Sequence, residues 1–391
     1  MDSIWRKITH NPERLALSGH IQTEAAVIGG GMAGILTAFF LQEAGVKTIV
    51  LEAGHVGEGQ TGSTTAKITA QHGLIYDGLI HSQGKEKAAL YARANSRAVE
   101  DYRSLVQSRN IQCRWLDCPA YLYTRCKRDV VENEVRACNE LGLPVTFVTD
   151  TQLPFPVAGA AKMEGQACFS PLEFLFNIAG ELTVYENTEV KRVEVITTAG
   201  GDVTAEHIVF AGHFPFINRP GYYFARMHQD RSYCLALSGA GHMEGMYYGM
   251  DEGDYSFRGL RLEDKDLVIL GGCNHRTGAN EGGRYERLRN SARSYWPDCK
   301  GGLVGPGLHD TGRGPLYWPF LPGSARLVRG HGLRQMGHEP FHGGGAAAGR
   351  SDYRKGKSRK GGVHALQVWL GCGGKPGEAG RLYHKGLCGE T

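Results

Sequence analysis

The segment "EAAVIGGGMAG", residues 24–34, constrains the fold more than any other part of the chain. A short apolar run, typical of a buried parallel strand, ends in the pattern G-x-G-x-x-G, formed by Gly29, Gly31 and Gly34. A helical pattern, "MAGILTAFFLQEAG", follows it, and a second apolar run, "VKTIVLEA", carries Glu52 near its end. Strand, glycine turn, helix, strand and acidic residue together predict a β-α-β unit that binds a dinucleotide.

Each residue of this pattern has its own physical reason. Gly29 allows a tight turn, Gly31 lets a pyrophosphate approach the backbone, and Gly34 lets the helix pack closely on the strand. The helix start offers free N–H groups and a partial positive charge to the phosphates. Glu52 can accept hydrogen bonds from both ribose hydroxyls, and its charge disfavours the 2′-phosphate of NADP. A glycine-rich turn without a ligand is the alternative.

The segment after Glu52 favours FAD over NAD. Residues 57–73, "GEGQTGSTTAKITAQHG", are rich in Gly, Ser and Thr, where NAD-binding domains usually continue with another helix and strand. Such a loop supplies N–H and O–H donors along an extended FAD, toward its pyrophosphate and its flavin ring. A solvated loop and an NAD-dependent dehydrogenase are the competing interpretations.

The rest of the chain up to residue 300 has the patterns of an ordinary α/β protein. Residues 1–23 indicate a polar lead-in. We expect helices over 84–110, over 127–141 and in "SPLEFLFNIAGEL" with Ser170 as N-cap, strands in "AYLYT" and between 182 and 212, and antiparallel strands at "RSYCLAL", "GMYYGM" and "DLVILGG".

Composition excludes several classes of protein. No run of 18 apolar residues occurs, so we predict no membrane span. The ten cysteines show no metal-ligand spacing, and no signal peptide precedes them. We therefore expect a cytoplasmic protein with reduced thiols and no metal site.

Several segments carry a family resemblance. "GGGMAGILTAFFLQEAGVKTIVLEAGHVGEGQTGSTTAKITAQHG", "YARANSRAVEDY", "LPFPVAGAAKMEGQACFSPLEFL" and "GGCNHRTG" resemble the FAD-dependent amine and amino-acid oxidoreductases of the D-amino-acid oxidase/glycine oxidase superfamily. "TGSTTAKITAQHGLIY" is similar to the branch sometimes fused to a Rieske domain. The resemblance covers about residues 3–300.

The resemblance implies an α/β fold in which a Rossmann-like FAD-binding domain of the GR2 type carries an antiparallel-sheet α+β substrate domain. It implies that residues 1–75 and 166–212 form the FAD-binding domain, and residues 76–165 and 213–300 the substrate domain. It places FAD against Gly29, Gly31, Gly34, Glu52, Thr61, Gly62, Ser63, Thr64, Thr65, Ala66, Val190 and Ala211-Gly212.

The implied reaction is hydride transfer from a carbon next to nitrogen to flavin N5, giving an imine that hydrolyses. The partners are then a small amine or amino-acid substrate and oxygen or another electron acceptor, with no nucleic acid and no membrane. Four side chains are candidates for the substrate site, each with a structural alternative. His72 and His275 could adjust their protonation or be structural, Tyr255 could face the substrate cavity, and Arg258 could hold a carboxylate or be an exposed strand arginine.

Residues 301–391 depart abruptly from this pattern. They hold 13 Lys and Arg against 5 Asp and Glu, with 24 glycines and no Ile or Asn, so two compositions are joined near residue 300. The flavin-closing motifs of the family and a Cys-x-His pair of a Rieske site are absent from them. We expect an aberrant Gly-rich basic tail, disordered, in which the last part of the FAD domain does not form.

A shift of reading frame accounts for the tail. Back-translating "LVGPGLHDTGRGPLYWPF" and reading one nucleotide later permits W-S-A-Q-D-C-M-T-L-D-G-V-P-Y-I-G-P, and "LVRGHGLRQMGH" permits W-Y-V-A-T-G-F-G-K-W-G-M. Both missing motifs appear in order, so our hypothesis is a frameshift between about residues 299 and 303. A genuine disordered tail, and a tail that binds nucleic acid or anionic surfaces through "RKGKSRKGG", are the alternatives. The frameshift predicts weak FAD retention, so an inactive flavin-fold remnant is the alternative function.

Overall fold

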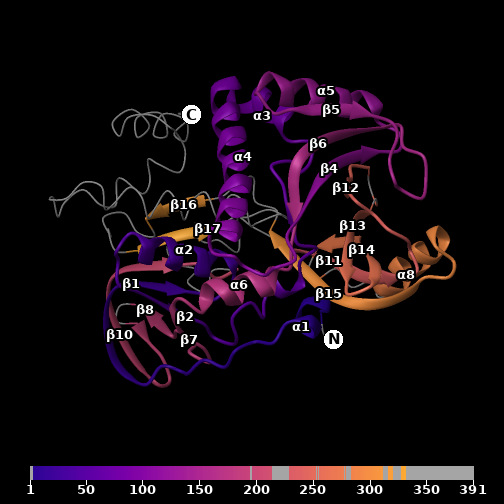
Figure 1. Ribbon diagram of the computed structural model, residues 1–391. Helices are drawn as coiled ribbons and strands as arrows, with labels where there is room; N and C mark the ends of the chain where they lie inside the picture. The colour runs from indigo at the N-terminus through magenta and orange to yellow at the C-terminus, as the bar shows by residue number, and fades with distance from the viewer. Residues whose placement is uncertain are drawn as a thin grey trace.

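Two β-sheets with helices packed between and around them make up the computed structural model (Figure 1). The structure describes residues 3–193, 196–213, 229–251, 253, 255–276, 278, 283–310, 316–319 and 327–331. The first sheet has the strand order β16-β17-β10-β1-β2-β7, with β8 and β9 attached beside β10. The second has the order β15-β11-β14-β13-β12-β4-β6-β3, with β5 paired to β6.

The first sheet contains the predicted β-α-β unit. β1 (Gly19–Ile28) pairs in parallel with β2 (Thr48–Leu51), and α2 (Met32–Glu43) connects them. β1 also pairs in parallel with β10 (Gly201–Phe210), and β2 with β7 (Thr183–Tyr185). The carboxyl ends of β1, β2 and β10 therefore meet at one edge, which is where open parallel sheets bind ligands.

The second sheet is antiparallel except for one parallel pair, β4 with β12. Its long central strands confirm the expected antiparallel fold class. Its strands are β3 (Lys67–Ile68), β4 (Leu116–Thr124), β5 (Val145–Val148), β6 (Gly159–Cys168), β11 (Gln229–Ser238), β12 (Met246–Gly249), β13 (Ser256–Leu262), β14 (Lys265–Arg276) and β15 (Lys300–Asp310).

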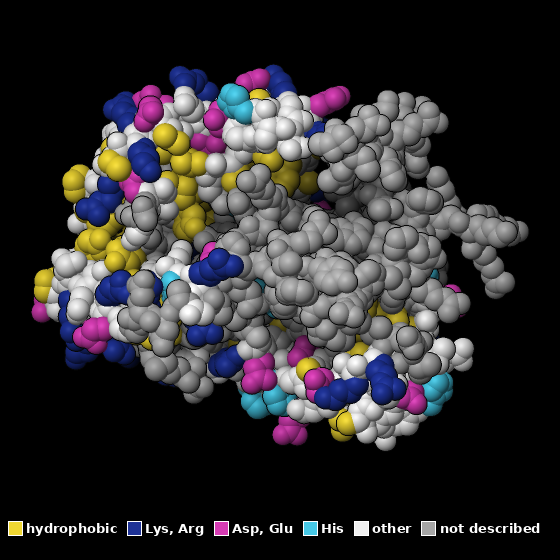
Figure 2. Space-filling view, turned by 180° about the vertical axis from the view of Figure 1, so that it is seen from behind, with side chains coloured by type: hydrophobic (Ala, Val, Ile, Leu, Met, Phe, Trp, Pro, Cys, Tyr) yellow, Lys and Arg dark blue, Asp and Glu magenta, His cyan; other side chains and the backbone are white. Residues whose placement is uncertain are grey.

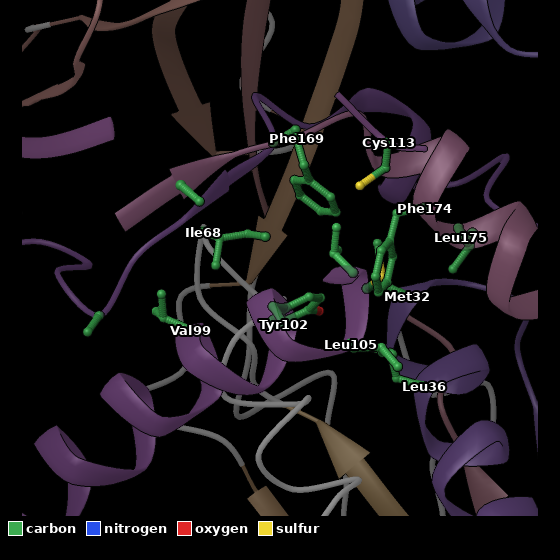
Figure 3. Packing of buried hydrophobic residues seen from close by; sticks show 14 of the residues in the cluster. Met32, Leu36, Ile68, Val99, Tyr102, Leu105, Cys113, Phe169, Phe174 and Leu175 are labelled. Atoms are coloured by element: carbon green, nitrogen blue, oxygen red, sulfur yellow. The ribbon is translucent and has the colours of Figure 1, made fainter. Parts of the chain in front are cut away.

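An aromatic cluster joins the helices to both sheets. Tyr102 of α4 (Lys85–Ser108) lies 6.1 Å from the ring of Phe169 and 5.4 Å from that of Phe174, which belongs to α6 (Pro171–Ala179). Met32 of α2 and Ile68 of β3 point into the same core (Figure 3). This core fixes the start of α2 relative to the edge of the second sheet.

The remaining elements are short. They are α1 (Ile4–Ile8), the 3-10 turn η1 (Thr61–Ser63), α3 (Tyr76–Gln83), α5 (Arg128–Glu140), α8 (Arg284–Tyr295), β8 (Arg192–Val193) and β9 (Ile196–Thr197). The polar lead-in expected over residues 1–23 contains regular structure, because Ser3 caps α1, Trp5 is fully buried in the core, and β1 already begins at Gly19.

Three segments of the range 301–391 have a described backbone, which differs from the expected disorder. β15 pairs with β11, β16 (Leu316–Pro319) pairs with β17 (Leu327–His331), and β17 pairs in parallel with β10. The physical reason is that a strand adds to a sheet edge through backbone groups, which every sequence possesses. The rest of that range lies outside the described residues.

No helix in the described ranges combines the length and apolarity that crossing a membrane requires. On the face shown in Figure 2, the coloured acidic and basic side chains are interspersed.

Candidate dinucleotide-binding site

At two glycines in and after the turn that ends β1, the surrounding backbone leaves no room for a side chain. Gly29 has φ +115°, and a Cβ there would lie 2.9 Å from the carbonyl carbon of Ala211. A Cβ on Gly34 would lie 1.8 Å from the Gly29 carbonyl oxygen. Backbone conformation and helix–strand packing thus require these two glycines, as the sequence predicted. Gly212 adjoins the turn, because its amide nitrogen lies 3.0 Å from the same Gly29 Cβ position.

Gly31 differs from Gly29 and Gly34. Its φ of −80° suits any residue, and a Cβ there would make an ordinary contact of 3.5 Å with the Thr61 hydroxyl. The protein's own packing therefore has space for a side chain at this position. A glycine that the protein does not need, at the N-terminus of α2, fits a cradle kept free for a pyrophosphate. The residues present fit the dinucleotide half of FAD on this observation.

Glu52 stands beside the turn at the end of β2. Its carboxylate accepts hydrogen bonds from the backbone N–H of Gly30, at 2.5 Å, and of Gly54, at 2.9 Å. A carboxylate has about four acceptor sites, so acceptors are left for ribose hydroxyls. Val190 is buried in the apolar cluster under the first sheet with Leu51, so the structure puts it next to this strand end.

The loop 61–66 runs from the turn toward the second sheet. Thr61 accepts a hydrogen bond from the Met32 N–H at 3.0 Å, which fixes the loop to the first turn of α2. A Cβ on Gly62 would lie 2.7 Å from the Gly57 carbonyl oxygen, so the turn is tight there too. Farther on, Trp5 donates from Nε1 to the Thr64 carbonyl at 2.8 Å. Ser63 closes η1 and Ala66 takes a left-handed conformation with φ +55°.

Arg258 donates hydrogen bonds to the same loop. Its Nη1 donates to the carbonyl oxygens of Thr65, at 3.1 Å, of Ala66, at 2.5 Å, and of Phe169, at 3.3 Å. Its guanidinium lies 5.4 Å from the ring centre of Trp5. The expectation of an exposed strand arginine is wrong, because Arg258 is 2% exposed. The structure gives it loop carbonyls as partners, and its role as a carboxylate clamp stays a prediction.

Tyr255 and His275 lie away from this loop. The Tyr255 hydroxyl lies 2.6 Å from the Ser291 hydroxyl of α8. Tyr255 directly precedes β13, and the prediction that it faces the substrate cavity stays a prediction. His275 contacts the Tyr233 hydroxyl through Nε2 at 3.0 Å and stacks on that ring, so its partners are those of a structural histidine.

His72 is half-buried beside the loop. Its Nε2 lies 3.0 Å from the Asn95 side-chain oxygen, and since Asn95 donates from its amide nitrogen to the Tyr91 carbonyl, Nε2 is the protonated nitrogen. Burial lowers the pKa of His72 to about 4. His72 is therefore neutral at pH 7, and the prediction that it titrates near neutral pH is wrong.

Two buried polar residues were missed by the sequence analysis. Lys67 donates from Nζ to the Tyr247 carbonyl at 3.0 Å, and burial lowers its pKa to about 8. Gln71 is 2% exposed, and neither atom of its amide has a partner among the described residues. A signal was present, because "AKITAQ" alternates small or apolar residues with polar ones. No group of three or more potential metal ligands occurs within the described ranges.

Comparison with known proteins gives consistent results. The family described as FAD dependent oxidoreductase (DAO) matches residues 24–326. A putative Rieske 2Fe-2S iron-sulfur protein of Bacillus subtilis (strain 168), YhfW, is 34% identical over 309 residues, which cover 75% of this chain and 61% of the relative. The gamma-glutamylputrescine oxidoreductase of Escherichia coli (strain K12) is 25% identical over 215 residues, half of each chain. The chain thus spans 61% and 50% of these two relatives.

Solved structures share the fold. Glycine oxidase from Geobacillus kaustophilus superposes with a TM-score of 0.67 at 18% identity, covering 83% of this chain and 93% of that chain. L-proline dehydrogenase from P. horikoshii superposes with a TM-score of 0.64 at 14% identity, covering 89% and 97%. At these identities the likeness concerns the fold alone.

Proposed function

The chain belongs to the DAO family of FAD-dependent oxidoreductases, and from this premise we propose that it oxidises a carbon–nitrogen bond of a small amine or amino acid. The observation that carries the proposal is Gly31, whose side-chain position the protein leaves open at the start of α2. The related E. coli protein is named for an amine, gamma-glutamylputrescine, and the matching solved structures include an oxidase and a dehydrogenase of amino acids.

When bound, FAD would accept the hydride, one hydrogen with its electron pair, that leaves the substrate carbon, and water would hydrolyse the resulting imine. The chain's own contribution is binding, orientation and exclusion of water. Gly31 and the start of α2 hold the pyrophosphate, Glu52 holds the ribose, and the loop 61–66 leads toward the second sheet. Arg258 keeps that loop in place. Because burial lowers the pKa of His72 to about 4, its neutral imidazole is a weak base near pH 7.

The test is anaerobic reduction of the bound flavin. Purified chain loaded with FAD is mixed with a series of amines and amino acids, and absorbance near the flavin maximum is followed. Bleaching by an amine, and none by the 2-hydroxy acid of the same carbon skeleton, supports the proposal. Bleaching by NADH or by hydroxy acids alone contradicts it. Reoxidation of the bleached enzyme by air then distinguishes oxygen from another electron acceptor.

We further propose that the chain departs from its family by a shift of reading frame near residues 299–303, and this bears on its activity. β17 lies beside β10 in the first sheet, with Leu327 opposite Ile208 and Arg329 opposite Phe210. The neighbouring frame permits W-Y-V-A-T over residues 327–331, a composition that suits a strand in a parallel sheet. The literal sequence writes L-V-R-G-H there, which does not.

The frame proposal is tested on nucleic acid. Sequencing of the gene should show that a one-nucleotide change restores A-T-G-F-G-K-W-G-M, and a nucleotide sequence that cannot encode this motif in any frame refutes the shift. If the shift holds, the literal chain is an inactive or weakly FAD-binding remnant of an active enzyme. A cytoplasmic location is also a proposal, supported by the eight cysteines of the described residues, which are all free. The domain boundaries inferred from the sequence likewise stay a prediction.

A further inference from the structure

The segment that follows the loop 61–66 buries three polar side chains. Ala66, Ile68 and Ala70 belong to the apolar core, while the residues between and after them are polar and equally buried. We call these three the polar row: Lys67, Thr69 and Gln71. Thr69 is paired within the segment, because its hydroxyl accepts from the Gln71 N–H at 3.0 Å. Burying polar groups costs free energy unless they are paired, so Lys67 and Gln71 are the two members of the row that point to a ligand.

Lys67 is a buried cation without a carboxylate. It is 3% exposed, and no Asp or Glu of the described residues forms an ion pair with it or with its buried neighbour Arg258. Desolvation lowers the pKa of Lys67, and the charge of Arg258 lowers it further. Two cations buried together without an acid form a site of positive potential.

Gln71 adds an independent observation. Its amide oxygen and nitrogen are both buried and both lack partners among the described residues. A buried amide without hydrogen bonds costs about 1–3 kcal/mol per group. One donor and one acceptor on the same side chain match the alternating N–H and C=O groups of a flavin's pyrimidine ring.

The position of the row fits the same ligand. β3 is the last strand in the order of the second sheet and pairs with β6. The chain reaches it directly from Thr61, which is hydrogen-bonded to the first turn of α2. An extended FAD whose pyrophosphate lies at α2 therefore runs alongside this segment toward its flavin end.

We propose that Lys67 is the counter-charge of the bound flavin: its ammonium group, supported by Arg258, stabilises negative charge on the pyrimidine ring, and Gln71 hydrogen-bonds the edge of that ring. This rests on the proposed function in requiring FAD. It goes beyond it by assigning a charge-stabilising residue.

Cys168 is the rival partner for the positive charge. It lies opposite Lys67 in the pairing of β3 with β6, and its sulfur lies 3.5 Å from that of Cys118. The hydrogen bond from Cys118, with the charges of Arg258 and Lys67, lowers the pKa of Cys168 to about 6. A thiolate there would satisfy Lys67 without any flavin, so the experiment must separate the two.

The experiment measures sulfite binding to the FAD-loaded full chain, in the literal and the frame-restored sequence. The sulfite lone pair forms a bond to flavin N5 and leaves a negative charge on the pyrimidine ring, which bleaches the flavin absorbance. Lys67→Met should weaken sulfite binding about tenfold or more, because a unit charge is lost from a buried site. Lys67→Arg keeps the charge and should stay near wild type. Lys162→Met, in β6 beside Glu164, is the matched control and should change nothing.

A pH series sharpens the result. Wild-type affinity for sulfite should fall at high pH, once the Lys67 ammonium loses its proton, and Lys67→Arg should lack that fall. Gln71→Leu should weaken FAD binding without lowering the melting temperature of the FAD-free chain, because the amide has no partner to lose in the described part of the chain.

The outcomes distinguish the explanations. Unchanged sulfite affinity in Lys67→Met, with slower alkylation of Cys168, assigns the charge to the thiolate and overturns the proposal. If Lys67→Met binds acetate more weakly, read from the flavin spectrum, but binds sulfite as the wild type does, the polar row binds a substrate carboxylate. That result also overturns the proposal. If neither version of the chain takes up FAD at saturating concentration, the proposed function itself fails, and this inference fails with it.

Discussion

At the scale of single residues, Gly31 and Gly34 require glycine for different physical reasons. An alanine at Gly34 would place its Cβ 1.8 Å from the Gly29 carbonyl oxygen, so Gly34→Ala should destabilise the fold by about 3 kcal/mol or more. An alanine at Gly31 meets an ordinary contact, so Gly31→Ala should keep the stability of the FAD-free chain within about 0.5 kcal/mol. It should nonetheless weaken FAD binding about tenfold or more, measured by flavin fluorescence. Full FAD affinity in Gly31→Ala would contradict the proposal that Gly31 makes room for the pyrophosphate.

Lys67 makes a prediction about stability and pH. Its pKa falls from 10.5 in the unfolded chain to about 8 in the fold because of burial. Between these two values the unfolded chain binds more protons, so wild-type stability rises as pH increases across this window. Lys67→Met should lack that rise and should be more stable at pH 7 by up to about 3 kcal/mol, reduced by the lost hydrogen bond to Tyr247. Urea unfolding of the FAD-free proteins at pH 7 and pH 10 measures both effects.

At the scale of elements, the buried carboxylate of Glu134, which belongs to α5, caps the N-terminus of another helix, α3. Glu134 of α5 accepts hydrogen bonds from the backbone N–H groups of Ile75, at 2.9 Å, Tyr76, at 2.8 Å, and Asp77, at 3.0 Å, at the start of α3. Glu134→Ala leaves one buried and two half-buried donors unpaired and should cost about 3 kcal/mol, seen as a lower melting temperature. Glu134→Gln keeps one acceptor oxygen and should lie between the two. An unchanged melting temperature in the alanine variant would contradict this capping role.

The same scale shows what could be predicted from the sequence. α4, α5 and α6 have apolar periods, and α2 is an apolar helix that follows the glycine turn. The structural bounds of all four lie within a few residues of the expected ones. α1, α3 and α8 were missed because each owes its place to contacts distant in sequence. Trp5 fixes α1 from inside the core, Glu134 caps α3 from another helix, and α8 buries little more than Leu288 and Ala292.

The candidate site divides in the same way. The glycine turn and Glu52 were predictable because the chemistry of the β-α-β unit is encoded within about 30 consecutive residues. The roles of Lys67 and Gln71 were not predictable, because they depend on which residues distant in sequence the fold places beside them. Arg258 was given the wrong surroundings for the same reason, since the carbonyls it binds belong to residues 65, 66 and 169.

At the scale of the whole molecule, the two sheets and the aromatic core form from residues before 300, while both sheets draw outer strands from later segments. β17 lies beside β10, whose carboxyl end adjoins the glycine turn, so its sequence should decide whether FAD is retained. The frame-restored chain should purify with about one FAD per chain, and added FAD should raise its melting temperature by mass action. The literal chain should purify with less and show a smaller rise. Gly31→Ala in the restored frame is the matched control, because it should fold yet lose the rise. Equal FAD content and equal shifts in both versions would show that the segments after residue 300 play no part in holding the cofactor.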